Sequence, residues 1–186
     1  MRPAFPSLLT ASVVLPALWG CGPRTERGGT ATIDAPIVVV VFDAGRPANP
    51  SARSSGVRLA VWEDGTVLVA ADPLHPERDM RVGQLAPDQL TAALSDLDQA
   101  GFFAQPATFL VAPDSDHLRV AARSKGTEQT HSLDRYHQLH ADWWPPVIAA
   151  LEQLRPPKTW PVADAATDGE FRGYILAEWW RTPWAR

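Results

Sequence analysis

Two histidines and an acid near position 140 are the residues whose types and spacing best suit metal chemistry. His137, His140 and Asp142 lie in the segment Tyr136-His137-Gln138-Leu139-His140-Ala141-Asp142. On a helix, residues three apart share one face, so both imidazoles could bind Zn²⁺, with Asp142 or His131 as a third ligand. The segment lacks the HExxH pattern and its glutamate base. A solvated helix surface is therefore the competing interpretation.

Other catalytic chemistry has no clear motif in the sequence. The chain contains neither a GxSxG elbow nor a glycine-rich phosphate loop. Paired carboxylates that hydrolyse glycosides stay open, because their separation in space rather than in sequence defines them. We therefore expect no cofactor and a binding protein rather than a catalyst. A metal-dependent or carboxylate hydrolase of the cell envelope is the alternative.

Tryptophan is unusually abundant, with eight residues in the chain. Two pairs are adjacent in sequence, Trp143-Trp144 and Trp179-Trp180. Rings of this size either complete a hydrophobic core or, when exposed, stack on a sugar or anchor a partner protein. Both interpretations stay open. The second makes Trp143, Trp144, Trp179 and Trp180 candidate ligand-binding residues, and a glycan-binding accessory domain is a further alternative.

The N-terminus has the parts of an export signal. Arg2 is basic, an apolar body runs from about Ala4 to Leu18, and small Gly20 precedes Cys21, the only cysteine. The four residues Leu18-Trp19-Gly20-Cys21 resemble the lipobox of bacterial lipoproteins, although Trp19 is bulkier than the residue usual there. The resemblance implies cleavage after residue 20 and acylation of Cys21. It also implies a cell-envelope location, periplasmic or at the cell surface, with membrane contact through the lipidated Cys21.

Two other interpretations of this N-terminus are a membrane-spanning helix and a plain signal peptide that is cut elsewhere. A spanning helix needs about 20 apolar residues, whereas this apolar run is shorter and contains Pro6 and Pro16. An unmodified single thiol in an exported protein would be unusual. Both observations favour the lipid anchor.

Charge and composition limit the partners of the remaining chain. Loss of Arg2 with the signal leaves 16 basic and 21 acidic residues, a net charge of −5. This balance argues against nucleic acid and against a polybasic contact with anionic lipid. We expect a signal peptide over residues 1–20, a flexible tether over 21–35 and a single domain over 36–186, which binds an envelope protein or a glycan.

The periodicity of the domain predicts an α+β fold, an antiparallel sheet with two main helices packed on one face. The expected helices are Pro87–Ala100 and Pro146–Leu154. The expected strands are Ile37–Phe42, Val57–Glu63, Thr66–Ala70, Met80–Leu85, Thr108–Ala112, His117–Arg123, Thr127–Leu133 and an edge strand at Tyr174–Leu176.

The strongest hairpin signal is Asp64-Gly65, which favours a two-residue turn. Such a turn pairs Val61 with Leu68 and Trp62 with Val67. Both faces of this hairpin are apolar, so we expect both to be covered.

The stretch from this turn through Leu85-Ala86-Pro87-Asp88-Gln89-Leu90 to Ala100-Gly101-Phe102-Phe103 carries a further resemblance. In element order it resembles a recurring theme of small exported bacterial domains and, more distantly, the emfourin-like inhibitors of thermolysin-type metalloproteases. Ala86 departs from the Ser or Thr usual before such a Pro-acidic pair. The resemblance implies a binding or inhibitory module, and it identifies no inhibitory residue.

Overall fold

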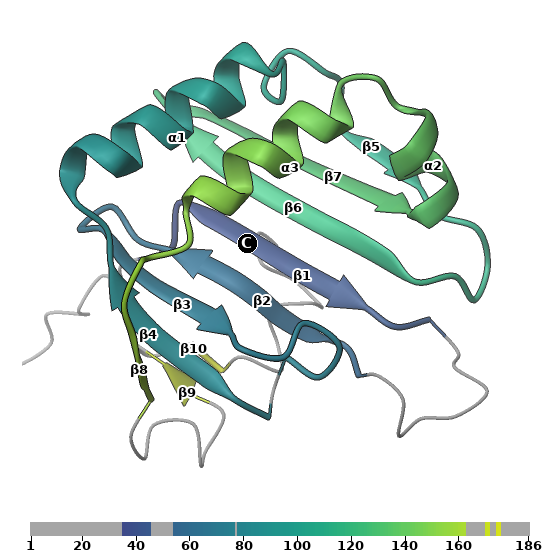
Figure 1. Ribbon diagram of the computed structural model, residues 1–186. Coiled ribbons are helices and arrows are strands. Elements are labelled where there is room, and N and C mark those ends of the chain that lie inside the picture. The colour runs from purple at the N-terminus through teal and green to yellow at the C-terminus, as the bar shows by residue number, and fades with distance from the viewer. Residues whose placement is uncertain (1–34, 46–53, 77, 163–169, 172–173, 176–186) are drawn as a thin grey trace, which may run out of the picture. The chain divides into compact units, whose positions relative to one another are not determined.

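The computed structural model describes residues 35–45, 54–76, 78–162, 170–171 and 174–175, all within one compact unit that spans Thr32–Arg186. Cys21, Trp179, Trp180 and the predicted signal peptide lie outside the described residues. The elements, labelled in Figure 1, are β1 (Val38–Asp43), β2 (Gly56–Val61), β3 (Thr66–Ala70), β4 (Met80–Gln84), α1 (Pro87–Gln99), β5 (Thr108–Leu110), β6 (His117–Ser124), β7 (Thr127–Asp134), α2 (Arg135–His140), α3 (Trp144–Gln153), β8 (Thr159–Pro161), β9 (Glu170–Phe171) and β10 (Tyr174–Ile175).

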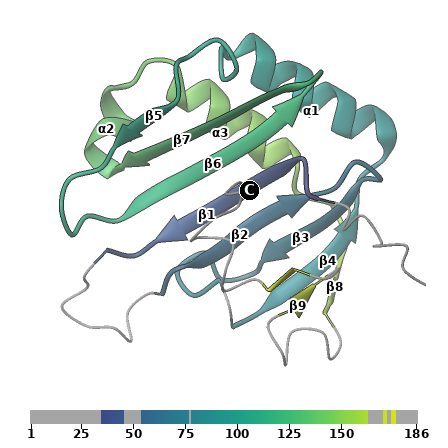
Figure 2. The same cartoon turned by 180° about the vertical axis from the view of Figure 1, so that it is seen from behind.

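Eight of these strands form one sheet in the order β5-β7-β6-β1-β2-β3-β4-β8, seen from behind in Figure 2. Neighbouring strands are antiparallel except β5 and β7, which run parallel with Phe109 opposite Ser132. The class is α+β, but the sheet is mixed, so the prediction of a purely antiparallel sheet was wrong. The physical reason is that β1 and β7 occupy the two edges of β6. β5 therefore pairs with the outer edge of β7 instead of with β6, the next strand in sequence.

The β2–β3 hairpin forms where it was predicted, but its register was predicted wrongly by one residue. Val61 lies opposite Val67, and Ala60 lies opposite Leu68. The N–H of Trp62 donates to the Thr66 carbonyl at 2.9 Å, and Gly65 has a φ of +81°. The connection is thus a three-residue loop that ends in a left-handed glycine, a common alternative to the two-residue turn.

Strand β1 defines two ends of the sheet. At its start, near Ile37, lie the β2–β3 and β6–β7 turns; we call this the turn end. At its finish, Asp43 lies beside His117, the first residue of β6, and β7 ends there at Asp134. We call this the far end.

Helix α1 begins at the predicted Pro87 and ends at Gln99, one residue before the predicted Ala100. Pro87 occupies the first turn, and Gln89 Oε1 accepts the Ala86 N–H at 3.1 Å, which supplies half of a capping box that Ala86 cannot complete. At the other end, the Phe102 N–H donates to the Leu97 carbonyl at 3.1 Å, and Gly101 has a φ of +80°. This Schellman arrangement stops the helix.

The central strands of the sheet have apolar side chains on both faces, as predicted for β1 and the β2–β3 hairpin. One hydrophobic cluster combines side chains of α1 and α3 with side chains of β1, β2, β3, β6 and β7, and Figure 1 shows both helices over the same region of the sheet. A second cluster faces away from the helices and consists of Val39, Val41, Val57, Ala60, Trp62, Leu68, Ala70 and Met80. Trp62 is 0% exposed. Strand β1 is thus buried on both faces, as its β-branched sequence indicates.

The C-terminal part departs from prediction in two places. Helix α3 begins at Trp144 rather than at Pro146. Tyr174–Ile175 pairs with Glu170–Phe171 in a separate two-stranded sheet, so the predicted edge strand is not part of the main sheet. β8 occupies that edge instead and pairs with β4. β8 is only three residues long and includes Pro161, which explains why it was missed.

Candidate binding groove

A groove of about 490 Å³ opens at the turn end, and we call it the turn-end groove. This volume falls in the range of sites that hold a small molecule or a few residues of a peptide. Its lining comes from α1, the β6–β7 turn, the start of β1 and the β2–β3 loop: Ile37, Glu63, Pro87, Leu90, Thr91, Leu94, Arg123, Ser124, Lys125, Gly126, Thr127 and Glu128.

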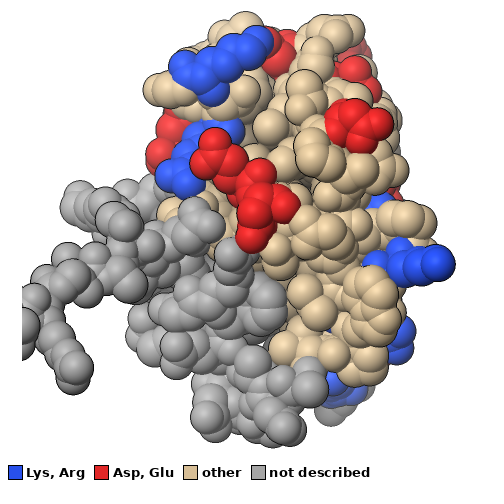
Figure 3. All heavy atoms as spheres, turned by 90° about the vertical axis from the view of Figure 1, so that its left-hand side faces the viewer, with Lys and Arg blue, Asp and Glu red and all other residues tan. Residues whose placement is uncertain are grey.

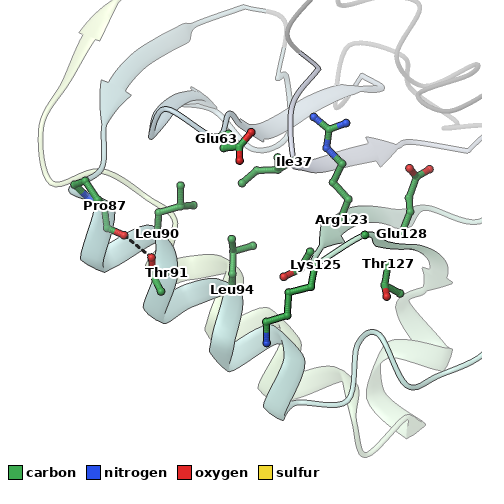
Figure 4. A pocket seen from close by; sticks show the side chains of 12 residues that line it. Ile37, Glu63, Pro87, Leu90, Thr91, Leu94, Arg123, Lys125, Thr127 and Glu128 are labelled. Atoms are coloured by element: carbon green, nitrogen blue, oxygen red, sulfur yellow. Dashed lines mark hydrogen bonds between the residues drawn. The ribbon is translucent and has the colours of Figure 1, made fainter.

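The helical wall of the groove comes from one face of α1. Leu90 and Leu94 are four residues apart, so they lie on the same side of the helix, and in Figure 4 they stand across the groove from Ile37. Leu90 and Ile37 are only 6% and 7% exposed. We call the three apolar side chains Ile37, Leu90 and Leu94 the floor of the groove. Thr91 is exposed at the rim, and its hydroxyl donates to the Pro87 carbonyl at 2.8 Å.

The opposite wall is the β6–β7 hairpin. Lys125 and Gly126 have φ values of +52° and +80°, the left-handed pair that a tight hairpin turn requires. Pairing of Arg123 with Glu128 across the two strands fixes their places beside the turn. The hairpin thus gives the groove a charged rim of both signs.

Long and solvent-exposed contacts leave this rim adaptable. Lys125 Nζ lies 3.5 Å from Asp98 Oδ2, with the two side chains 82% and 53% exposed, an arrangement that contributes little to stability. Arg123 is better fixed, because its Nη2 donates to the Ala35 carbonyl at 2.7 Å. Figure 3, which views the molecule from the left of Figure 1, shows acidic and basic residues interspersed on a largely uncharged surface.

The predicted metal ligands are not gathered into a site. His140 and Asp142 are exposed, while His137 Nδ1 donates to Asp134 Oδ1 at 2.8 Å. His131 is 0% exposed, and its Nε2 donates to the Phe102 carbonyl at 2.9 Å. Across the part of the chain that the structure describes, no group of three His, Cys, Asp or Glu side chains is placed to hold a metal ion.

Burial determines the chemistry of His131. Its ring lies 4.6 Å from the Phe102 ring and 4.9 Å from the Trp143 ring, in edge-to-face contact with both. Desolvation by burial lowers the pKa of His131, and the hydrogen bond to Phe102 opposes this effect only in part. His131 is a neutral member of the aromatic core.

Asp134 is a structural residue that our sequence interpretation missed. It caps α2 through a 2.9 Å bond from the His137 N–H to Oδ1, and Oδ2 accepts the Ala112 N–H at 2.8 Å. The backbone bond from His137 is the main reason that its pKa falls to about 2; the Ala112 bond and the His137 ring act in the same direction, and burial opposes them. The ionised Asp134 therefore fastens α2 and the segment after β5 to the end of β7.

The first tryptophan pair contributes to the core. Trp144 is 1% exposed and Trp143 is half-buried, with their rings 5.3 Å apart and perpendicular. Neither offers a flat exposed platform for a sugar ring. Trp179 and Trp180 lie outside the described residues, as does Cys21.

No helix in the described ranges has the length and apolarity needed to cross a bilayer. No protein-family model, no curated protein and no solved structure matches the chain. The groove was not predicted from the sequence, because its walls come from segments up to 91 positions apart, Ile37 to Glu128. The only local signal was the cluster of charges around Lys125-Gly126.

Proposed function

We propose that this chain is a lipid-anchored, extracytoplasmic module that binds a partner protein, and that a short extended segment of the partner lies in the turn-end groove. The observation that carries the proposal is the groove itself, with an apolar floor of Ile37, Leu90 and Leu94 beneath a charged rim. Such a combination suits a ligand that offers apolar anchors together with polar groups.

The charge of the rim supports a polypeptide as the occupant. Glu63 and Glu128 are acidic, whereas Arg123 and Lys125 are basic. A peptide segment carries donors, acceptors and side chains of both signs, so it can complement such a rim, whereas a polyanion would meet two carboxylates. The resemblance to emfourin-like inhibitors makes a protease one form of this partner.

The proposed module has its two long helices packed on one face of the sheet. The shared cluster of α1, α3 and five strands supports this layering. Because Leu90 and Ala93 of α1 belong to that cluster, the helical wall is held against the sheet. The groove is thus pre-formed, which lowers the entropic cost of binding.

A photo-crosslinking amino acid placed in α1 tests the site. Thr91 lines the groove, whereas its neighbour Ala92 is exposed and does not. With the probe at position 91 in the full chain, expressed in its own envelope, we expect one reproducible protein adduct. The matched probe at position 92 should give less than about a tenth of that adduct.

A second variant shows whether the groove floor is responsible. Leu94→Asp places a charge on the floor and should reduce adduct formation from position 91 about tenfold or more. Its circular dichroism spectrum should stay that of the parent, because Leu94 is only partly buried. Equal adducts at both positions, or recovery of glycan without protein, would argue against a protein partner.

The anchor has its own test. Mass spectrometry of the membrane-extracted protein should show an acylated Cys21 as the first residue, and Cys21→Ser should move the protein to the soluble envelope fraction. An unmodified N-terminus would remove the anchor from the proposal without touching the groove.

A further inference from the structure

His117 at the far end is a buried polar side chain that the groove does not involve. It is 8% exposed, and neither ring nitrogen has a hydrogen-bond partner within the described part of the chain. Its Nε2 lies 3.9 Å from Asp43 Oδ2, too far for a hydrogen bond but near enough for attraction between charges. The Phe109 ring is inclined by 72° to the His117 ring, with centroids 6.3 Å apart.

Asp43 already connects two segments through its other oxygen. Oδ1 accepts the Gly45 N–H at 3.2 Å and the Ser55 hydroxyl at 3.1 Å. The Ser55 hydroxyl in turn accepts the Ala44 N–H at 3.0 Å. One carboxylate therefore holds the exit of β1 against the approach to β2, while Oδ2 is directed at β6.

The charged groups around His117 are mostly acidic. Asp43 flanks it on β1 and Asp134 on β7, in register, but the oxygens of Asp134 are occupied by Ala112 and His137. β5 contributes the uncharged Phe109. On β6 itself, Asp116 precedes His117 and interacts with Arg58, Asp114 lies in the turn before it, and Arg119 donates to Ser132 at 3.3 Å.

We propose that His117 and Asp43 form an acid-operated latch. Imidazole is the side chain that gains a proton near neutral pH, and an unpaired buried imidazole is costly to keep. Once protonated, Nε2 donates to Asp43 Oδ2 at the length of a charge-assisted bond, a movement of about 1 Å. The latch then joins β6 to β1 and, through Oδ1, to Gly45 and Ser55. Mildly acidic pH therefore stabilises the contacts between β1 and β6 at the far end.

Amide hydrogen exchange of the full chain tests the latch. Between pH 7.5 and 5.5, after correction for the intrinsic chemical rate, exchange at Ala44 and Gly45 should slow by about three- to tenfold. Asp43→Asn keeps an oxygen for Gly45 but has no charge for His117, so this slowing should be lost. His117→Gln should lose it as well.

His140→Gln is the matched control, since His140 is exposed on α2 and remote from Asp43 in sequence; it should keep the full slowing. Ring NMR signals of His117 provide a readout that does not depend on the His117→Gln variant. At pH 5.5 they should report an Nε2–H that is hydrogen-bonded, and Asp43→Asn should abolish that signal. If His117→Gln fails to fold, these signals decide. Exchange at Ala44 and Gly45 that is independent of pH, or ring signals that ignore Asp43→Asn, would overturn the latch.

Discussion

The two ends of the sheet differ in whether their charged side chains are buried or exposed. At the far end, charged and polar side chains are buried: Asp134 accepts three hydrogen bonds of 2.8–2.9 Å, and His117 is nine-tenths covered. At the turn end, Lys125 and Asp98 are 3.5 Å apart and largely exposed. The far end uses charge to hold the chain together, and the turn end leaves charge available at the rim of a groove.

This difference separates stability from binding. Buried charged groups cannot be removed without leaving partners unsatisfied, whereas exposed pairs are worth little. Substitutions of the buried groups at the far end should therefore lower the free energy of unfolding by more than substitutions of the exposed pair at the turn end.

The largest effect is expected for Asp134→Ala. It removes the cap of α2 and leaves the Ala112 N–H unpaired, so the free energy of unfolding should fall by about 2–4 kcal/mol. Urea denaturation measures the change. Asp98→Ala removes the same type of side chain at the turn end and should lower the free energy of unfolding by about 0.5 kcal/mol or less. Equal losses would mean that the two ends do not differ as described.

Two glycines with left-handed backbone give a matched comparison of packing. Gly45 at the far end has a φ of +60°, and a Cβ there would lie 2.5 Å from the Asp114 carbonyl oxygen. Gly126 at the turn end has a φ of +80° and no atom within 4 Å of such a Cβ. Gly126→Ala should cost about 1 kcal/mol from backbone strain alone. Gly45→Ala should cost about 2–3 kcal/mol because a clash is added. Thermal unfolding that ranks them in the reverse order would contradict the tight packing of the far end.

Acid should weaken the far end below the pH range of the latch. The pKa of Asp134 is lowered to about 2 from the ordinary 3.8. A lowered folded-state pKa contributes stability that is complete above the unfolded value, and this contribution is lost as the pH falls from about 4 towards 2. The free energy of unfolding of the parent should therefore fall more steeply over this range than that of Asp134→Asn. Parallel curves would show that Asp134 is not held ionised.

Local signals allowed much of the fold to be predicted. The β-branched run of β1, Pro87 at the start of α1 and Gly101 after its end each act through neighbouring residues. The prediction of the β2–β3 register failed because Asp64-Gly65 is compatible with both a two-residue and a three-residue loop. The parallel pairing of β5 with β7 was not predicted because it depends on which edge of the sheet is unpaired, and no local segment of the sequence determines that.

The candidate sites were harder to predict for the same reason. His137 was a candidate metal ligand, with a solvated helix surface as the competing interpretation, but the acid that bonds to it is Asp134, three residues earlier at the N-cap of α2. An acid at this position before a helix is itself an N-cap signal, so the contact could have been predicted from the sequence. The groove was not, because Leu94, Arg123 and Glu63 come together only after the sheet has formed.

The brevity of both edge strands has a consequence for crowding. β5 and β8 are three residues each, and β8 ends with Pro161, which has no N–H to donate. An anchor at Cys21 would confine many copies to one plane, where long open edges would pair edge to edge into insoluble ribbons. Edges this short give a neighbouring copy too few ladder bonds to start such growth, so anchored copies would stay separate even when crowded.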